Sequence, residues 1–147
     1  MKDGAKILVA YDGSKESMEA VKEGADLAKR FKGSLTVLNV YWDPREAQYE
    51  PEVRRTEKTS IGDMGSMRVL DDVEPMLKDS KVKFDLRSVK DPNVPKTILR
   101  IAEDEGYGCI ALGSRGKGGA KAWLLGSVSS RVIAEASCPV MVVNLSA

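Results

Sequence analysis

Short apolar runs alternate along this chain with longer segments whose apolar residues recur every three or four positions. A short apolar run is typical of a buried strand, and the longer period is typical of an amphipathic helix. The runs predict five strands, over residues 6–11, 35–40, 82–89, 108–112 and 139–143. Strands that alternate with helices are characteristic of a parallel sheet covered on both faces, so we expect an α/β fold.

Capping and breaking residues mark the ends of the predicted helices. Ser14 is placed to cap the first helix and Gly33 to end it. A second helix is predicted from Ile61 to Leu77, although Pro75 within it would remove a hydrogen bond and crowd the preceding turn. The last helix is expected to begin near Ser127.

Two segments depart from this regular pattern. The third predicted strand alternates apolar with charged residues, which is typical of a half-exposed edge strand. Residues 41 to about 59 form a long polar insert without periodicity of its own. Such an insert is either a disordered loop or a segment with a lid or partner-binding role.

The composition indicates one domain, residues 1–147, of ordinary size. The 23 basic and 22 acidic residues are evenly mixed and aromatic residues are few, so nothing indicates a nucleic-acid partner. No apolar run is long enough to cross a bilayer and no leader is recognisable, so we expect a cytoplasmic protein without a membrane partner. Cys109 and Cys138 lack CxxC spacing and fit small apolar core residues better than a disulfide.

The chain contains no histidine, which narrows the chemistry it can perform. His-dependent catalytic triads and His-ligated metal sites are excluded. Because the usual general base at neutral pH is missing, any catalysis would rest on carboxylates, lysines or a bound metal. We therefore expect no dedicated enzyme, and we expect any turnover to be slow.

The most distinctive chemistry lies after the fourth predicted strand. Gly113-Ser114-Arg115-Gly116 follows that strand directly, and Gly126-Ser127 comes after nine further residues, at the start of the last helix. Glycines allow backbone N–H groups to approach an anion, and a helix N-terminus adds unpaired donors and partial positive charge. The segment predicts a phosphate-binding site, and hence nucleotide binding. The alternative is a loop that binds nothing.

With Asp12 after the first strand and these glycines after the fourth, the chain resembles the universal stress protein family from Ile7 to Val143. The spacing G-x-x-G-(nine residues)-G-S matches that of the ATP-binding members. The resemblance implies a doubly wound five-stranded parallel sheet, strand order 3-2-1-4-5, with helices on both faces. In that order the winding reverses between strands 1 and 4, and ligands of such sheets bind there, at the carboxyl ends of the strands.

The resemblance also implies roles for individual residues. Asp12, with Gly13, would contact the ribose or hold a metal near the phosphates, although Asp12 also suits a turn or helix cap. Val40 and Val89 would lie at the adenine, where Lys90 in place of a small residue would narrow or recharge the pocket. The ribose and phosphates would meet the glycine segments, namely Gly113, Ser114, Arg115, Gly116, Gly126, Ser127 and Val128.

These features predict a protein that binds an adenine nucleotide, which is ATP or else ADP or AMP. Mg²⁺ or Mn²⁺ could bind together with the phosphates. The resemblance implies a homodimer that acts as a regulatory or stress-response switch and is joined through the apolar strand Val140 to Val143. Burial of that strand within the monomer is the alternative. The other hypotheses are a slow metal-dependent ATP hydrolase or phosphotransferase that uses Asp12, and a chaperone-like dimer with an empty pocket.

Overall fold

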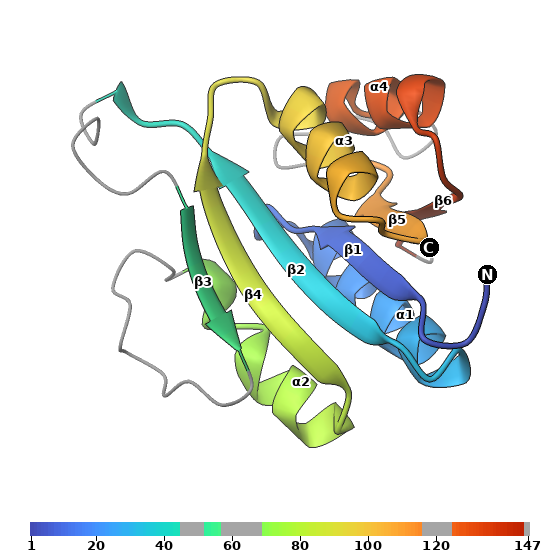
Figure 1. The fold of residues 1–147 in the computed structure, drawn as a ribbon. Helices are drawn as coiled ribbons and strands as arrows, with labels where there is room; N and C mark the ends of the chain where they lie inside the picture. Colours follow the sequence, from blue (N-terminus) through green and yellow to red (C-terminus); the bar gives the residue numbers. More distant parts are fainter. Residues whose placement is uncertain (45–51, 57–68, 116–124, 146–147) are drawn as a thin grey trace.

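The computed structural model describes residues 1–44, 52–56, 69–115 and 125–145 (Figure 1). In these residues six strands form one sheet in the order β3-β4-β2-β1-β5-β6. The strands are β1 Lys6–Ala10, β2 Ser34–Tyr41, β3 Glu52–Thr56, β4 Lys83–Lys90, β5 Cys109–Gly113 and β6 Val140–Val143. The helices are α1 Lys15–Arg30, α2 Glu74–Ser80, α3 Val94–Asp104 and α4 Ser127–Glu135.

The predicted α/β fold is confirmed, whereas the prediction of five strands in the order 3-2-1-4-5 is wrong because a sixth strand is present. β1, β2, β4, β5 and β6 pair in parallel, and β3 pairs antiparallel with β4. β3 lies within the 41–59 segment, for which no strand was predicted. It also covers the outer side of β4, so the third predicted strand is not an edge. Without β3, the parallel strands keep the expected succession, and the winding still reverses beside β1.

Charged side chains hold β3 in place. Arg55 is 1% exposed, and its Nη2 lies 2.7 Å from Asp71 Oδ1 and 2.8 Å from Glu74 Oε2. Arg87 on β4 pairs with Glu52 at the start of β3. Buried guanidinium groups need such partners because a desolvated charge is costly when it is alone. The partners lie far away in the sequence, so a hydropathy pattern does not reveal this strand.

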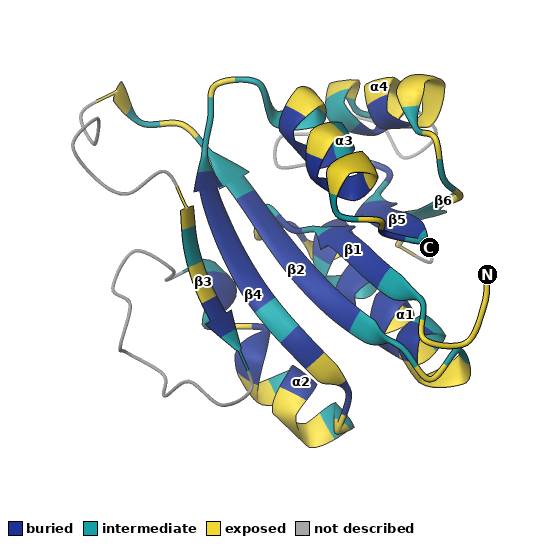
Figure 2. Ribbon diagram, viewed as in Figure 1, coloured by how far each residue is buried: buried dark blue, intermediate teal, exposed yellow. Residues whose placement is uncertain are grey.

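Two apolar clusters, one on each face of the sheet, make up the core. Successive residues of a strand point to opposite faces, so Ile7 packs with α1 and α2 whereas Leu8 packs with α3 and α4. Figure 2 shows the resulting burial of the central strands. Burial on both sides explains why these strand segments are almost continuously apolar in the sequence. Cys109 and Cys138 form no disulfide, as predicted.

The predicted ends of α1 are confirmed by local contacts. The Ser14 hydroxyl accepts a hydrogen bond from the Ser17 N–H at 3.1 Å and caps the helix. The helix ends at Arg30, just before Gly33. A Cβ on Gly33 would lie 1.8 Å from the Ala5 carbonyl oxygen, so only glycine lets the chain pass this close to β1.

α2 differs from the predicted helix Ile61–Leu77. Residues 57–68 lie outside the described part of the chain, and the described helix starts at Glu74. Pro75 occupies its first turn, where proline is tolerated because the N–H there has no intrahelical acceptor. The longest described helix, α1, has 16 residues, and none of the described helices has the length and apolar character needed to cross a bilayer.

Candidate functional site

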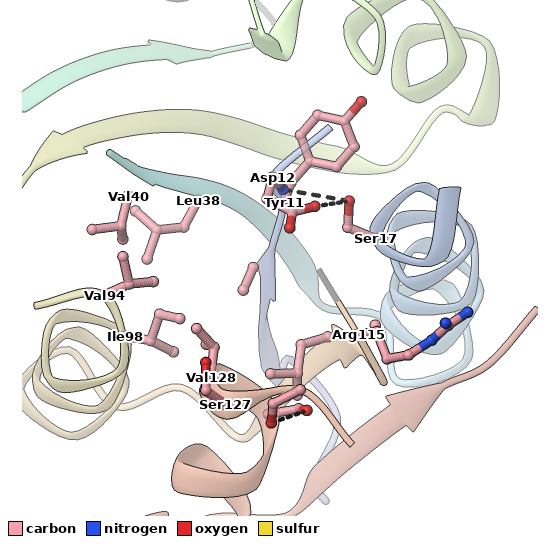
Figure 3. A pocket seen from close by; sticks show the side chains of 15 residues that line it. Tyr11, Asp12, Ser17, Leu38, Val40, Val94, Ile98, Arg115, Ser127 and Val128 are labelled. Atoms are coloured by element: carbon pink, nitrogen blue, oxygen red, sulfur yellow. Dashed lines mark hydrogen bonds between the residues drawn. The ribbon is translucent and has the colours of Figure 1, made fainter. Parts of the chain in front are cut away.

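A cavity of about 430 Å³ opens at the carboxyl ends of β1, β2 and β5, where the winding of the sheet reverses. Ligands of doubly wound sheets bind at this position. Its apolar wall consists of Ala10, Leu38, Val40, Val94, Ile98 and Leu112. The other lining residues are Tyr11, Asp12, Ser17, Gly113, Arg115, Gly126, Ser127, Val128 and Ser129. Figure 3 shows the side chains from β2 and α3 on one side of the cavity, opposite Asp12, Ser17 and Arg115.

The first turn of α1 orients Asp12. Its Oδ1 accepts hydrogen bonds from the Ser14 N–H at 2.9 Å and from the Ser17 hydroxyl at 3.0 Å. Gly13, between them, has a φ of +87°, a left-handed conformation that favours glycine. Asp12 therefore acts as the turn residue that the alternative interpretation described, and it also lines the cavity. Gly13 supplies the turn but is not part of the lining.

The end of β1 is fixed by β2. The Tyr11 N–H donates to the Leu38 carbonyl at 2.8 Å, and the buried Asn39 amide donates to the Tyr11 carbonyl at 3.0 Å. The Tyr11 ring points away from the cavity (Figure 3) and packs in the core cluster that contains α1. Burial, and then the charges of Asp72 and Asp12, raise the pKa of the Tyr11 phenol. The ring is therefore a neutral part of the core at physiological pH.

Gly113 allows the end of β5 to contact α1 directly. A Cβ at this position would lie 2.6 Å from Glu16 Cβ, 2.9 Å from the Glu16 carbonyl carbon and 3.0 Å from the Ser17 nitrogen. Two of these three are backbone atoms, which cannot rotate away. The absence of a side chain thus brings the end of β5 beside the turn that holds Asp12.

Ser114, Gly126 and Ser129 form a junction that joins the two ends of the glycine-rich segment. The Ser114 carbonyl accepts hydrogen bonds from the Gly126 N–H at 2.7 Å and from the Ser129 hydroxyl at 2.8 Å. The Ser114 N–H donates to the Val143 carbonyl at 2.9 Å. Ser114 is 2% exposed and does not line the cavity. It therefore holds the two ends of the glycine-rich segment together without contributing to the cavity surface. We call these three residues the loop junction.

The first turn of α4 contributes three backbone N–H groups that have no acceptor in the described part of the chain. Gly126 is its N-cap and provides no side-chain cap, and the first intrahelical bond runs from the Ser130 N–H to the Gly126 carbonyl. The Ser127, Val128 and Ser129 N–H groups have no acceptor among the described residues, as expected for the start of a helix. All three residues line the cavity. The Gly126 N–H is already used within the loop junction, so the available donors begin at Ser127.

Arg115 lines the cavity, but its guanidinium extends toward α1 (Figure 3). Its Nη2 lies 3.0 Å from Glu16 Oε1. As for metals, the described residues contain no group of three acidic, cysteine or histidine side chains that could hold an ion. Asp12 is the one carboxylate among the described lining residues.

The sequence-based site and the cavity overlap in part. Seven predicted residues line it, namely Asp12, Val40, Gly113, Arg115, Gly126, Ser127 and Val128. Gly13, Val89, Ser114 and also Lys90 are not lining residues, and Gly116 lies outside the described part of the chain. The cavity also has eight lining residues that the sequence did not predict, namely Ala10, Tyr11, Ser17, Leu38, Val94, Ile98, Leu112 and Ser129. The spacing of Leu38 with Val40 on one strand face, and of Val94 with Ile98 on one helix face, was the available signal.

Comparison with known proteins identifies the family. The chain matches the model of the Universal stress protein family over residues 5–144. It is 32% identical over 148 residues to a universal stress protein of Methanocaldococcus jannaschii, and the match covers 95% of this chain and 81% of the relative. The chain therefore belongs to the universal stress protein family, as the resemblance indicated.

Solved structures of universal stress proteins share the fold. One of them, in complex with cAMP, is 18% identical, has a TM-score of 0.72 and is matched over 99% of this chain and 100% of its own length. Another, from Archaeoglobus fulgidus in complex with dAMP, is 16% identical, has a TM-score of 0.66 and is matched over 98% of this chain and 100% of its own. These similarities support the α/β architecture described above.

Proposed function

We propose that this protein binds an adenine nucleotide in the cavity between β1 and β5. The observation that carries the proposal is the first turn of α4: Ser127, Val128 and Ser129 line the cavity, and their N–H groups have no acceptor among the described residues. Such a helix start attracts phosphate because its N–H groups and its dipole both favour negative charge. The phosphates of the nucleotide bind here.

The apolar wall of the cavity is suited to the base. Leu38 and Val40 of β2 and Val94 and Ile98 of α3 form an apolar surface, on which a flat purine buries its faces. The cavity volume of about 430 Å³ falls within the range of about 300–1,000 Å³ that is usual for small-molecule sites. Two solved relatives are in complex with cAMP and dAMP, ligands that each contain an adenine and a single phosphate group, which supports binding of an adenine nucleotide by this chain.

The available contacts are sufficient for useful affinity. Hydrogen bonds to a charged group contribute about 1.5–3 kcal/mol each. Three such bonds together with burial of the base reach the roughly −8 kcal/mol of a micromolar complex. We propose ATP as the physiological ligand, with ADP and AMP as the competing candidates.

A divalent cation would accompany the nucleotide and would not form a centre of its own. Mg²⁺ is commonly held by one or two carboxylates together with phosphate oxygens. The lining residues offer Asp12, whose Oδ1 already accepts two hydrogen bonds. Asp12 could therefore supply one ligand to a cation that is otherwise held by the nucleotide phosphates. With one carboxylate in the described lining and no histidine in the sequence, we propose binding and not hydrolysis as the function.

We further propose that the protein works as a homodimeric switch joined through β6. β6 is an edge strand of the described sheet, it is apolar, and its four residues are half-buried. Pairing with β6 of a second copy would cover this edge symmetrically. Sedimentation with and without nucleotide tests this: a dimer whose stability depends on the nucleotide is expected, and a monomer under both conditions would contradict it.

The binding proposal is tested by titration calorimetry with AMP, ADP, ATP and GTP. The informative variant is Ser127→Pro, because proline is favoured in the first turn of a helix and Gly126 has the extended backbone (φ −72°, ψ 166°) that a following proline requires. The variant removes one N–H and leaves the helix intact. Ser127→Ala is the matched control, since it removes the hydroxyl and keeps the N–H.

We expect Ser127→Pro to weaken adenine-nucleotide binding about 10- to 100-fold, which corresponds to the loss of one charge-assisted hydrogen bond. Ser127→Ala should change the affinity by much less, and GTP should bind more weakly than ATP to the unmodified protein. Equal affinities of the Pro and Ala variants would show that the start of α4 does not bind the phosphates. Failure of the unmodified protein to bind any adenine nucleotide would reject the function.

A further inference from the structure

A shielded ion pair connects the exit of β5 to the start of α1. Arg115 Nη2 lies 3.0 Å from Glu16 Oε1, and the two side chains are only 19% and 11% exposed. The residues are 99 positions apart in the sequence. Glu16 does not line the cavity, whereas Arg115 does. The pair therefore lies just behind the proposed nucleotide site.

Each residue of the ion pair is adjacent in sequence to a residue that helps to orient the cavity lining. Glu16 precedes Ser17, whose hydroxyl donates to Asp12. Arg115 follows Ser114, whose carbonyl accepts the Gly126 N–H in the loop junction. Gly113 adds direct contact between the same two segments. The ion pair thus holds the turn that orients Asp12 against the segment that orients α4.

We infer that Arg115 is a positioning residue that acts through Glu16, and that it is not a ligand of the phosphates. This inference rests on the proposed function of the cavity. If Arg115 turned toward a phosphate, it would leave the carboxylate of Glu16 shielded from water without this cation, which is costly. The ion pair instead remains closed when the nucleotide binds, and it keeps the loop junction and Asp12 at a fixed separation.

Nucleotides of different length distinguish positioning from direct contact. Glu16→Gln and Arg115→Gln should each weaken AMP and ATP by the same factor, about tenfold, and the double variant should be no weaker than either single one, because contacting residues are strongly non-additive. Glu19→Gln is the matched control, since Glu19 pairs on the same helix with Lys22 in solvent, with side chains 38% and 52% exposed. It should bind as the unmodified protein does.

A phosphate-binding role for Arg115 predicts the opposite pattern. Arg115→Gln would then weaken ATP far more than AMP, and Glu16→Gln would tighten ATP binding by releasing the guanidinium. Either result would overturn the inference. The charge-reversed pair Glu16→Arg with Arg115→Glu should recover most of the affinity if the ion pair alone matters, and further loss in this double variant would also contradict it.

Amide hydrogen exchange without nucleotide tests the ion pair independently of the proposed function. The Gly126 N–H, bonded to the Ser114 carbonyl, should exchange about tenfold faster in Glu16→Gln and Arg115→Gln than in Glu19→Gln, because loss of the pair loosens the loop junction. Unchanged exchange would overturn the inference even if nucleotides bind. Faster exchange in a protein that binds no nucleotide would reject the proposed function and retain the structural role of the pair.

Discussion

Substitution of Gly113 by alanine should disturb the close contact between the end of β5 and the first turn of α1, which lies beside the cavity. The added Cβ would lie 2.6 Å from Glu16 Cβ, 2.9 Å from the Glu16 carbonyl carbon and 3.0 Å from the Ser17 nitrogen. An ordinary contact begins at about 3.4 Å, so the end of β5 and the first turn of α1 must separate by several tenths of an ångström. No rotamer change can relieve the contacts with backbone atoms.

The structural cost and the functional cost are both measurable. Overpacking of this kind destabilises a protein by about 1–3 kcal/mol. In a chain of this length, each kcal/mol lowers the melting temperature by about 2–4 °C, so we expect a decrease of about 2–12 °C. Ser17 and Asp12 lie on the displaced turn, and we therefore expect weaker adenine-nucleotide binding at temperatures where the variant is fully folded.

Gly108→Ala is the matched control, at the other end of β5. Its Cβ would meet Ala5 Cβ at 3.5 Å and the Lys6 carbonyl oxygen at 3.7 Å, which are ordinary contacts. Thermal unfolding followed by circular dichroism and titration calorimetry should separate the two variants. If Gly113→Ala melts and binds nucleotide like Gly108→Ala, the close approach of β5 to α1 does not control the site, and the argument from Gly113 fails.

Two further predictions concern the buried charges around β3 and β4. Arg55→Ala should lower the free energy of unfolding by about 3–5 kcal/mol in urea denaturation, because Glu74 is 0% exposed and would lose its closest cation; a loss below about 1 kcal/mol would contradict this. Burial alone would raise the pKa of Glu105, but the hydrogen bond and charge of Arg87 outweigh it and lower the pKa below its ordinary value of 4.5. The stability that this pair provides is therefore complete above pH 4.5 and is lost as the pH falls through the lower folded-state value. Glu105→Gln should flatten the acid side of a plot of urea midpoint against pH, and an unchanged slope would refute the assignment.

The sequence was sufficient for the parallel strands because burial on both faces requires continuous apolar runs. It was insufficient for β3, whose Glu-Val-Arg-Arg-Thr segment carries no apolar face. The partners of Arg55 come from the region of α2 and its preceding turn, and the partner of Glu52 is Arg87 on β4. Pro75 would interrupt a helix that begins at Ile61, but the described helix starts one residue before the proline, where proline is tolerated.

The polar half of the cavity was easier to predict than the apolar half. Asp12 and the glycines stand out because aspartate and glycine mark the turns that link the predicted strands to the helices that follow them. Leu38, Val94 and Ile98 have the periodicity of core residues, and only the reversal of the winding beside β1 leaves them facing a cavity. A residue pattern within one element does not contain that information, because it depends on the order of the strands.

The glycine motif illustrates why a residue type and its role must be separated. Gly126 has a φ of −72°, which any residue can adopt, and its N–H is bonded to Ser114. Neither property makes it a phosphate ligand. It begins α4 without a capping side chain, and the next three residues, which line the cavity, have N–H groups without an acceptor among the described residues. Gly113, in contrast, is required by the atoms of Glu16 and Ser17 that it faces. The two glycines therefore shape the same cavity in different ways. Gly126 begins α4 without a capping side chain, and Gly113 permits contact between β5 and α1.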